Sequence, residues 1–209
     1  SASLTLSNIV IDGAECTVDA AHAAETDSII KAANGGTIVL NSGAILQNNK
    51  AAQFGSGILA NNRVNITMED GAIIRNNTNR NYELGGGILI GNSSTFTMNG
   101  GDLNITTYQG SGFSGNASGG WGGGMGGDGN ANKTDISAKG IKAVGLYDEA
   151  GTTWQSGGNL IVNGGTITID SSDDSLHCGG DMQLLGGSMT LATADDGVHS
   201  DLAKIIGST

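Results

Sequence analysis

The chain has 209 residues, of which 37 are glycine and none is proline, and its formal net charge is −11. Nucleic acid and anionic membranes repel so acidic a chain, and no run of 18 apolar residues is present that could form a transmembrane helix. Abundant glycine without proline suits tight corners joined by continuous sheet, because proline would remove a hydrogen-bond donor from the strand ladder.

Short apolar segments recur along the amino-terminal half. Residues 41–49 match residues 69–77, and residues 55–60 match residues 85–90 at a slightly longer offset. Asn-Gly, Asp-Gly and Gly-Gly pairs separate these segments and favour corners with positive φ. Alternating apolar residues predict strands at 4–11, 37–40, 58–59, 64–68, 72–75, 88–90, 95–98 and 103–106. Helical turns fit only two segments, 19–33 and 201–206.

The carboxy-terminal half repeats more closely. Residues 159–178 match residues 181–200 at an offset of 22. A period of this size with alternating apolar strands is typical of a solenoid, in which equivalent residues stack from one coil to the next. The offset places Asp173 on Asp195, Asp174 on Asp196, and His177 on His199. We therefore expect four carboxylates and two imidazoles to lie together on one side of the molecule.

A third, degenerate copy precedes these two. Residues 138–143 align with residues 173–178 once an insertion between them is allowed for. The alignment brings Lys139 beside the stacked carboxylates and Lys142 beside the stacked imidazoles. The predicted face therefore changes from cationic to anionic along the solenoid axis.

These repeats predict an all-β, right-handed, single-stranded parallel β-helix of seven to eight coils. The rival architecture, an antiparallel sandwich, gives no reason for sequence identity that recurs at this spacing. We expect one continuous β-helix over residues 1–209. Its predicted parts are longer-period coils at 1–107, a Gly-rich loop at 108–136, and 22-residue-period coils at 137–209 with an insertion at 144–156.

Two cysteines, Cys16 and Cys178, fall in different coils. A disulfide requires Cα atoms within about 7 Å, whereas the intervening coils would hold the two residues much farther apart. We expect both to be free thiols that are buried at least in part.

Calcium is the metal that suits the predicted carboxylate cluster. It takes six to eight oxygen ligands, and two stacked Asp-Asp corners would supply the side chains of Asp173, Asp174, Asp195 and Asp196. Without a compensating cation these four charges would repel one another. Two interpretations are open at this point: a calcium site, or a solvated ladder of aspartates at corners, where Asp is common.

The neighbouring side chains also allow more than one interpretation. His177 and His199 either contact a sugar or a metal, or lie on an outer sheet face without a ligand. Because calcium disfavours nitrogen ligands, histidine ligation would need zinc. Lys139 and Lys142 either balance the aspartates or, beside a metal, act as the base of a polysaccharide lyase. Trp154, on the insertion, is the aromatic ring best placed to stack on a sugar.

The carboxy-terminal half, about residues 98–209, resembles the calcium-dependent carbohydrate-binding β-helix proteins that bacteria secrete. The motifs that carry the resemblance are Ser137–Ala143, Leu160–Ile169, Ser172–His177 and Asp195–Ser200, with the Gly-rich loop before them. The resemblance implies a right-handed β-helix, bound calcium, and affinity for acidic plant polysaccharides such as polygalacturonate. The same half also looks like the scaffold of pectate lyases.

The amino-terminal half resembles the pectin-lyase-like β-helix repeats of large bacterial surface proteins. Its opening at Leu4–Gly13 and the later Gly-Ala-Ile-Leu-Gln-Asn-Asn and Gly-Gly-Gly-Ile segments carry this resemblance. The pattern implies an adhesin or an envelope location more than any chemistry.

Three functions are compatible with these observations. The favoured one is calcium-dependent binding of acidic polysaccharide outside the cell or at the bacterial surface, with Lys139, Lys142, His177, His199 and Trp154 contacting the ligand. The second is a structural adhesin or self-assembling fibre in which coil ends stack into a homopolymer. The third is a polysaccharide lyase, which is less favoured because few loops are present to form a cleft. No catalytic residue is assigned.

Overall fold

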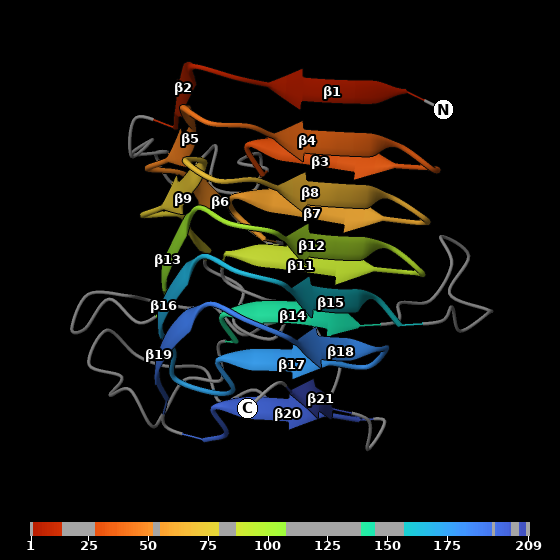
Figure 1. The fold of residues 1–209 in the computed structure, drawn as a ribbon, viewed down its shortest axis with the longest axis vertical. Helices are drawn as coiled ribbons and strands as arrows, with labels where there is room; N and C mark the ends of the chain where they lie inside the picture. The colour runs from red at the N-terminus through yellow and green to blue at the C-terminus, as the bar shows by residue number, and fades with distance from the viewer. Residues whose placement is uncertain are drawn as a thin grey trace, which may run out of the picture.

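Parallel strands stacked in three sheets form the protein (Figure 1). The computed structural model describes residues 2–13, 28–51, 55–79, 87–107, 139–144, 157–193, 195–201 and 205–207. No helix occurs in these ranges, so none of them holds an apolar helix long enough to cross a bilayer. The predicted all-β solenoid of parallel strands is confirmed, while its handedness and number of coils stay predictions.

Successive coils add their strands to the three sheets in turn. The first sheet contains, in spatial order, β1 (Ser3–Leu6), β4 (Thr37–Leu40), β8 (Asn65–Met68), β12 (Thr95–Met98), β15 (Asn159–Val162), β18 (Met182–Leu184) and β21 (Ile205–Gly207). The second contains β2 (Ile9–Asp12), β5 (Ala44–Gln47), β9 (Ile73–Arg75), β13 (Asp102–Thr106), β16 (Thr166–Asp170) and β19 (Ser188–Ala192). The third contains β3 (Ile30–Ala33), β7 (Ile58–Asn61), β11 (Ile88–Gly91), β14 (Ile141–Val144), β17 (Leu176–Cys178) and β20 (Val198–Ser200). A separate pair joins β6 (Lys50–Ala51) to β10 (Thr78–Asn79).

The strand register reproduces the sequence periods. Thr37 pairs with Asn65 and Asn65 pairs with Thr95, as the longer offsets of the amino-terminal half predict. Thr166 pairs with Ser188, as the shorter offset of the carboxy-terminal half predicts. Strands on either side of residues 108–138 also pair, β11 with β14, β12 with β15, and β13 with β16. Stacking of equivalent residues is therefore confirmed for both halves of the chain.

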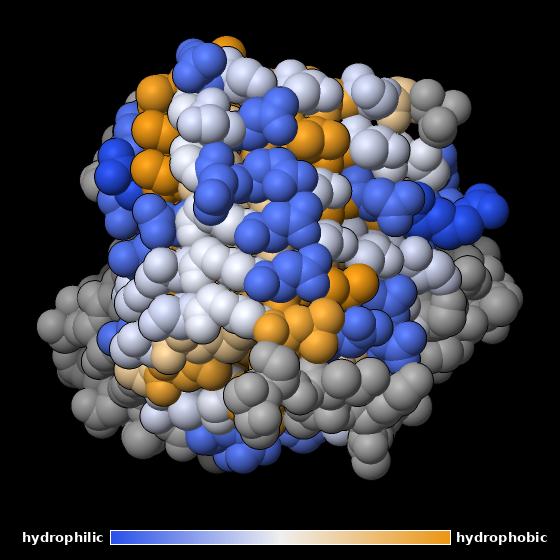
Figure 2. Space-filling view, in the orientation of Figure 1, coloured by the Kyte–Doolittle hydropathy of each residue, from blue (hydrophilic) through white to orange (hydrophobic). Residues whose placement is uncertain are grey.

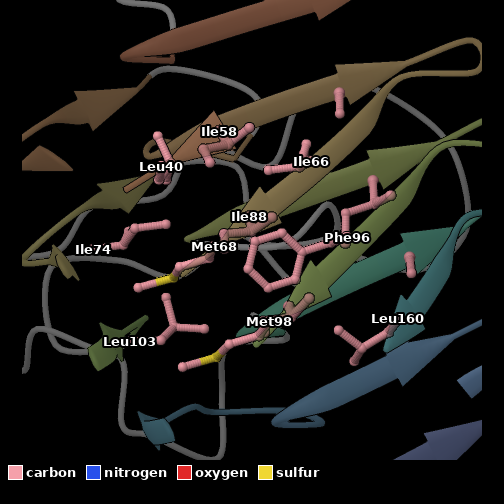
Figure 3. Close-up of a cluster of buried hydrophobic side chains, with 14 of the residues drawn as sticks. Leu40, Ile58, Ile66, Met68, Ile74, Ile88, Phe96, Met98, Leu103 and Leu160 are labelled. Atoms are coloured by element: carbon pink, nitrogen blue, oxygen red, sulfur yellow. The ribbon is translucent and has the colours of Figure 1, made fainter. Parts of the chain in front are cut away.

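Alternation along each strand sends every second side chain into the interior. In β4, Ile38 and Leu40 are buried, while Thr37 and Val39 are only partly so. Burying one such side chain contributes about 1.5–3 kcal/mol, and the neighbouring coils above and below supply the contacts. Figure 3 shows side chains from all three sheets meeting in this core: Leu40, Ile58, Ile66, Met68, Ile74, Ile88, Phe96, Met98, Leu103 and Leu160.

The corners between sheets have the backbone conformation that the sequence predicts. Gly165 and Gly187, equivalent residues of the two closest repeats, have φ of 91° and 93°. Asparagine takes similar conformations at other corners, where its amide also bonds to the coil next to it. Asn62 Nδ2, for example, donates to Asn34 Oδ1 over 2.7 Å, and both residues have positive φ.

One sequence prediction is wrong. Residues 30–33 and 205–206, expected to form helical turns, belong to strands β3 and β21. Pairing of β3 with β7 and of β21 with β18 supplies backbone hydrogen bonds that override the weak local helical preference. Other predictions concern parts of the chain outside the described residues: Cys16, the Gly-rich loop at 108–136, and nearly all of the insertion, including Trp154.

Asn77, a buried residue between β9 and β10, provides a test of the fold. Its side chain, 1% exposed, accepts from the Asn49 backbone N–H and donates to the Leu46 carbonyl, each over 3.0 Å. Asn77→Ala would leave both backbone groups buried without these partners, so we expect the free energy of unfolding to fall by about 1–3 kcal/mol. Urea denaturation measures the change. Asn104→Ala, on the exposed side of β13, is the matched control and should change it by less than about 0.5 kcal/mol.

Candidate functional site

The repeated Asp-Asp pairs lie at equivalent corners between the second and third sheets. Asp173 and Asp174 lie between β16 and β17, and the second pair lies one coil further on, between β19 and β20. Local hydrogen bonds hold the first corner: the Ser171 hydroxyl donates to the Asp173 carbonyl over 2.8 Å, and the Asp174 N–H donates to Asp173 Oδ1 over 2.8 Å. Thr193 Oγ1, from the next coil, donates to the same carbonyl.

Three of the four predicted carboxylates converge. Asp173, Asp174 and Asp195 each present an oxygen within 4.8 Å of the others. Asp174 is almost completely buried, at 3% exposed, whereas Asp195 is exposed. The fourth, Asp196, donates its backbone N–H to Asp174 Oδ1 over 3.4 Å, and its own carboxylate lies 3.3 Å from His199 Nδ1.

Lys139 lies against this carboxylate cluster. Its Nζ is 2.5 Å from Asp173 Oδ2 and 3.5 Å from Asp174 Oδ2. Gly140, directly after Lys139, lets the backbone here pack closely against the next coil. A Cβ at Gly140 would lie 2.7 Å from the Ser175 carbonyl oxygen and 2.6 Å from the Ile169 side chain. One ammonium therefore offsets part of the charge of Asp173 and Asp174, to which the carboxylate of Asp195 lies close.

Lys142 and the two histidines form a row across the third sheet. Lys142 pairs with His177 in the register of β14 and β17, and His177 pairs with His199 in that of β17 and β20. All three side chains are partly exposed, while Ile141 beside them is buried. The row is continuous from coil to coil, as the alignment of the third copy predicts.

The two imidazoles stack on each other between carboxylates. Their ring centroids are 4.6 Å apart and their planes differ by 7°. His177 Nδ1 lies 2.7 Å from Asp174 Oδ2. On the opposite edge, the Nε2 atoms of His177 and His199 lie 3.3 Å from Asp201 Oδ2 and Oδ1, respectively.

Asp201 is a site residue that sequence comparison of the repeats does not find. Its equivalent in the preceding repeat is Gly179, so the carboxylate has no counterpart in the preceding coil. Gly179 also gives it room, because a Cβ at Gly179 would lie 3.1 Å from Asp201 Oδ2. The sequence feature that could have indicated Asp201 is its position directly after His199 and Ser200, at the end of β20.

Cys178 lies behind the histidine row, inside the core. It is a buried free thiol, and Sγ lies 3.4 Å from the carbonyl oxygens of Gly158 and Asp181, either of which can accept its single S–H. Burial raises the pKa of this thiol above its usual value, because desolvation disfavours the thiolate. Its Sγ is therefore a poor metal ligand and a poor nucleophile at neutral pH.

Comparison with known proteins gives one family. A family described as "Carbohydrate-binding domain-containing protein" matches residues 4–197, which include both the longer-period coils and the 22-residue repeats. No curated protein and no solved structure matches the chain.

The burial of Cys178 predicts slow chemical labelling. In a Cys16→Ser variant, where Cys178 is the only thiol, we expect reaction with Ellman's reagent at pH 8 to be at least about a hundredfold slower than in the urea-unfolded chain. Absorbance at 412 nm measures both rates. Similar rates in the folded and unfolded states would show that the thiol is accessible and contradict its placement in the core.

Proposed function

Since the chain belongs to the family of carbohydrate-binding domain-containing proteins, we propose that it binds acidic polysaccharide through calcium at its Asp-Asp corners. The observation that carries the proposal is the convergence of Asp173, Asp174 and Asp195 beside Lys139. The ligand class is an anionic glycan of the polygalacturonate kind, and the site would bind it without changing it.

The carboxylate cluster has the chemistry that calcium requires. Oxygens bound to one calcium at 2.3–2.6 Å can lie up to about 5 Å apart, and the three carboxylates present oxygens within 4.8 Å of one another. A calcium ion takes six to eight oxygen ligands, so three carboxylates leave positions for water and for a carboxylate of the glycan. Lys139 would contact Asp173 alongside the ion. Its ammonium would offset the charge of a second uronate of the glycan, next to the one whose carboxylate binds the ion.

The charge of the chain explains why a cation would be needed. The net charge of −11 opposes approach of a polyanion, and the carboxylates of the corners add local repulsion. A divalent ion at the cluster, together with Lys139, neutralises the three carboxylates and can bridge protein and sugar. Lys142 and His177, in register along the third sheet, would extend the contact surface in the direction of the coil axis.

Binding fits the geometry of Lys139 better than lyase chemistry does. A lyase base has to present a nitrogen to the C5 proton of a uronate. Lys139 Nζ is instead engaged with Asp173 over 2.5 Å and is largely covered, with 12% of its side chain exposed. We therefore propose a positioning cation in the sugar site and assign no catalytic residue.

We further propose the finer features that accompany this function. The solenoid would be right-handed with seven to eight coils, and the protein would act outside the cell or at the bacterial surface, where acidic polysaccharide occurs. Trp154, outside the described residues, would stack on a sugar ring from the insertion.

Retention on immobilised polygalacturonate tests the proposal. We expect the protein to be retained in calcium and released by EDTA, because the ion bridges two sets of carboxylates. Asp173→Asn combined with Asp195→Asn should weaken retention at least tenfold. Asp102→Asn, an exposed acid on β13, is the control and should behave like the original protein. Equal retention in calcium and EDTA would exclude a calcium bridge.

A second candidate function, end-to-end assembly, is favoured by exposed apolar residues at one end of the stack. Leu4, Ile9 and Val10 are 41%, 42% and 54% exposed, and Figure 2 shows hydrophobic residues at the surface near the N-terminal end. Within the described ranges, β1 and β2 are the outermost strands of their sheets. Their open edges could pair with another copy of the chain.

Light scattering after size exclusion tests this assembly. We expect the average mass to rise with concentration, because pairing of coil ends buries these side chains. Leu4→Lys combined with Val10→Lys should shift the rise to at least tenfold higher concentration, whereas Asn104→Lys on an exposed side of the stack should not. A constant monomer mass at all concentrations would exclude this function.

A further inference from the structure

We propose that Asp174, His177 and His199, with Asp196 beside the second ring, form a second metal site that takes a divalent transition metal of the zinc class. It lies on the Nδ1 edge of the stacked imidazoles, next to the calcium cluster proposed above. The proposal does not depend on glycan binding.

The four side chains come from one motif stacked on itself. Asp174 precedes His177 by three residues, Asp196 precedes His199 by three, and the strands pair in register. Nδ1 of each ring faces the carboxylate of its own coil, over 2.7 Å in the first and 3.3 Å in the second. Nδ1 of the second ring also lies 3.8 Å from Asp174 Oδ2. Nitrogens of both rings and an oxygen of Asp174 therefore lie within 4.8 Å of one another, while Asp196 contacts the second ring only.

Asp201, on the opposite edge of the two rings, leaves too few hydrogen-bond donors on the Nδ1 side when no cation is bound. Asp201 places one carboxylate oxygen 3.3 Å from each Nε2 atom. An ionised carboxylate only accepts, and a neutral imidazole carries a single N–H. When both Nε2–H groups donate to Asp201, both Nδ1 lone pairs point at the oxygens of Asp174 and Asp196. Acceptor then faces acceptor, unless a cation or an additional proton lies between them.

A metal resolves this conflict better than two extra protons. Two imidazolium rings stacked 4.6 Å apart would repel each other, and Lys139 Nζ already lies 3.5 Å from Asp174 Oδ2. A single dication avoids the facing positive charges and supplies compensation to the five neighbouring carboxylates: Asp173, Asp174, Asp195, Asp196 and Asp201.

The distances from Asp174 Oδ2 to both Nδ1 atoms are near those of a zinc site, and the stacked rings would turn toward each other so that both Nδ1 lone pairs reach one ion. Tetrahedral zinc binds nitrogen and oxygen at about 2.0–2.2 Å, which separates neighbouring ligand atoms by roughly 3.3 Å. The observed separations of 2.7, 3.3 and 3.8 Å lie on both sides of that value. Asp201 would take the part of the outer carboxylate that fixes the tautomer of metal-bound histidine. Calcium is disfavoured here because two of the three converging ligand atoms are nitrogens.

The site is covered on the side of Asp174 and His177 and open on the side of His199 and Asp196. The side chains of Asp174 and His177 are 4% and 12% exposed, whereas those of His199 and Asp196 are 39% and 59% exposed. An ion can therefore enter from the outermost described coil and contact a buried ligand pair. Both sites would use Asp174, so variants that separate them have to change the histidines.

Calorimetric titration of metal-free protein with zinc chloride, in the absence of glycan, tests the proposal. We expect one zinc per chain with a dissociation constant in the micromolar range or below. His199→Ala and His177→Ala should each weaken zinc binding at least thirtyfold. The exposed carboxylate of Asp102, on another sheet, provides the control, and Asp102→Asn should bind zinc as the original protein does.

Imidazole ¹⁵N spectra of the unsubstituted protein give a readout that does not depend on whether the variants fold. Zinc should shift the Nδ1 resonances of both rings and leave Nε2 protonated. The proposal is overturned if zinc binds equally well to the His177→Ala, His199→Ala double variant. It is also overturned if both rings carry two protons and their resonances do not respond to zinc.

Discussion

In-register pairing of each strand with its equivalent in the next coil is the constraint on which the rest of the structure depends. A single coil cannot cover its own apolar row, so Ile38 is buried only because coils stack around it. The same register places every corner residue above its counterpart. The core and the functional face are therefore two consequences of one alignment, and a polar residue repeated in sequence is stacked in space.

Stacking identical residues has opposite effects for neutral and charged side chains. Asparagines gain hydrogen bonds from it, as Asn62 does with Asn34. Aspartates at the last corners instead lie close enough to repel, and Lys139 compensates only part of that charge. A surface that concentrates uncompensated carboxylates and imidazoles is electrostatically costly unless cations bind there. This cost, together with membership of a carbohydrate-binding family, is the reason that we propose metal-dependent glycan binding.

Most of the fold could be predicted from the sequence, because its periods report the register directly. The longer offsets of the amino-terminal half and the shorter offset of the carboxy-terminal half all recur as strand pairs. Single segments without a clear repeat were harder: the strand at 30–33 has weak strand propensity and is held by its pairing with β7. In the site, the position of Lys139 was predictable, but Asp201 was not, because a residue absent from the repeats leaves no period to detect. The turn of Asp196 toward His199 depends on side-chain geometry that spacing alone does not specify.

We propose that cations at the stacked Asp corners hold an acidic sugar. Crystals grown with calcium and a short oligogalacturonate, measured at a wavelength where calcium scatters anomalously, test it most directly. We expect an anomalous peak among Asp173, Asp174 and Asp195, with a sugar carboxylate bound to the ion and directed toward Lys139. Sugar bound elsewhere on the solenoid, or bound at this corner without an anomalous peak, would contradict it.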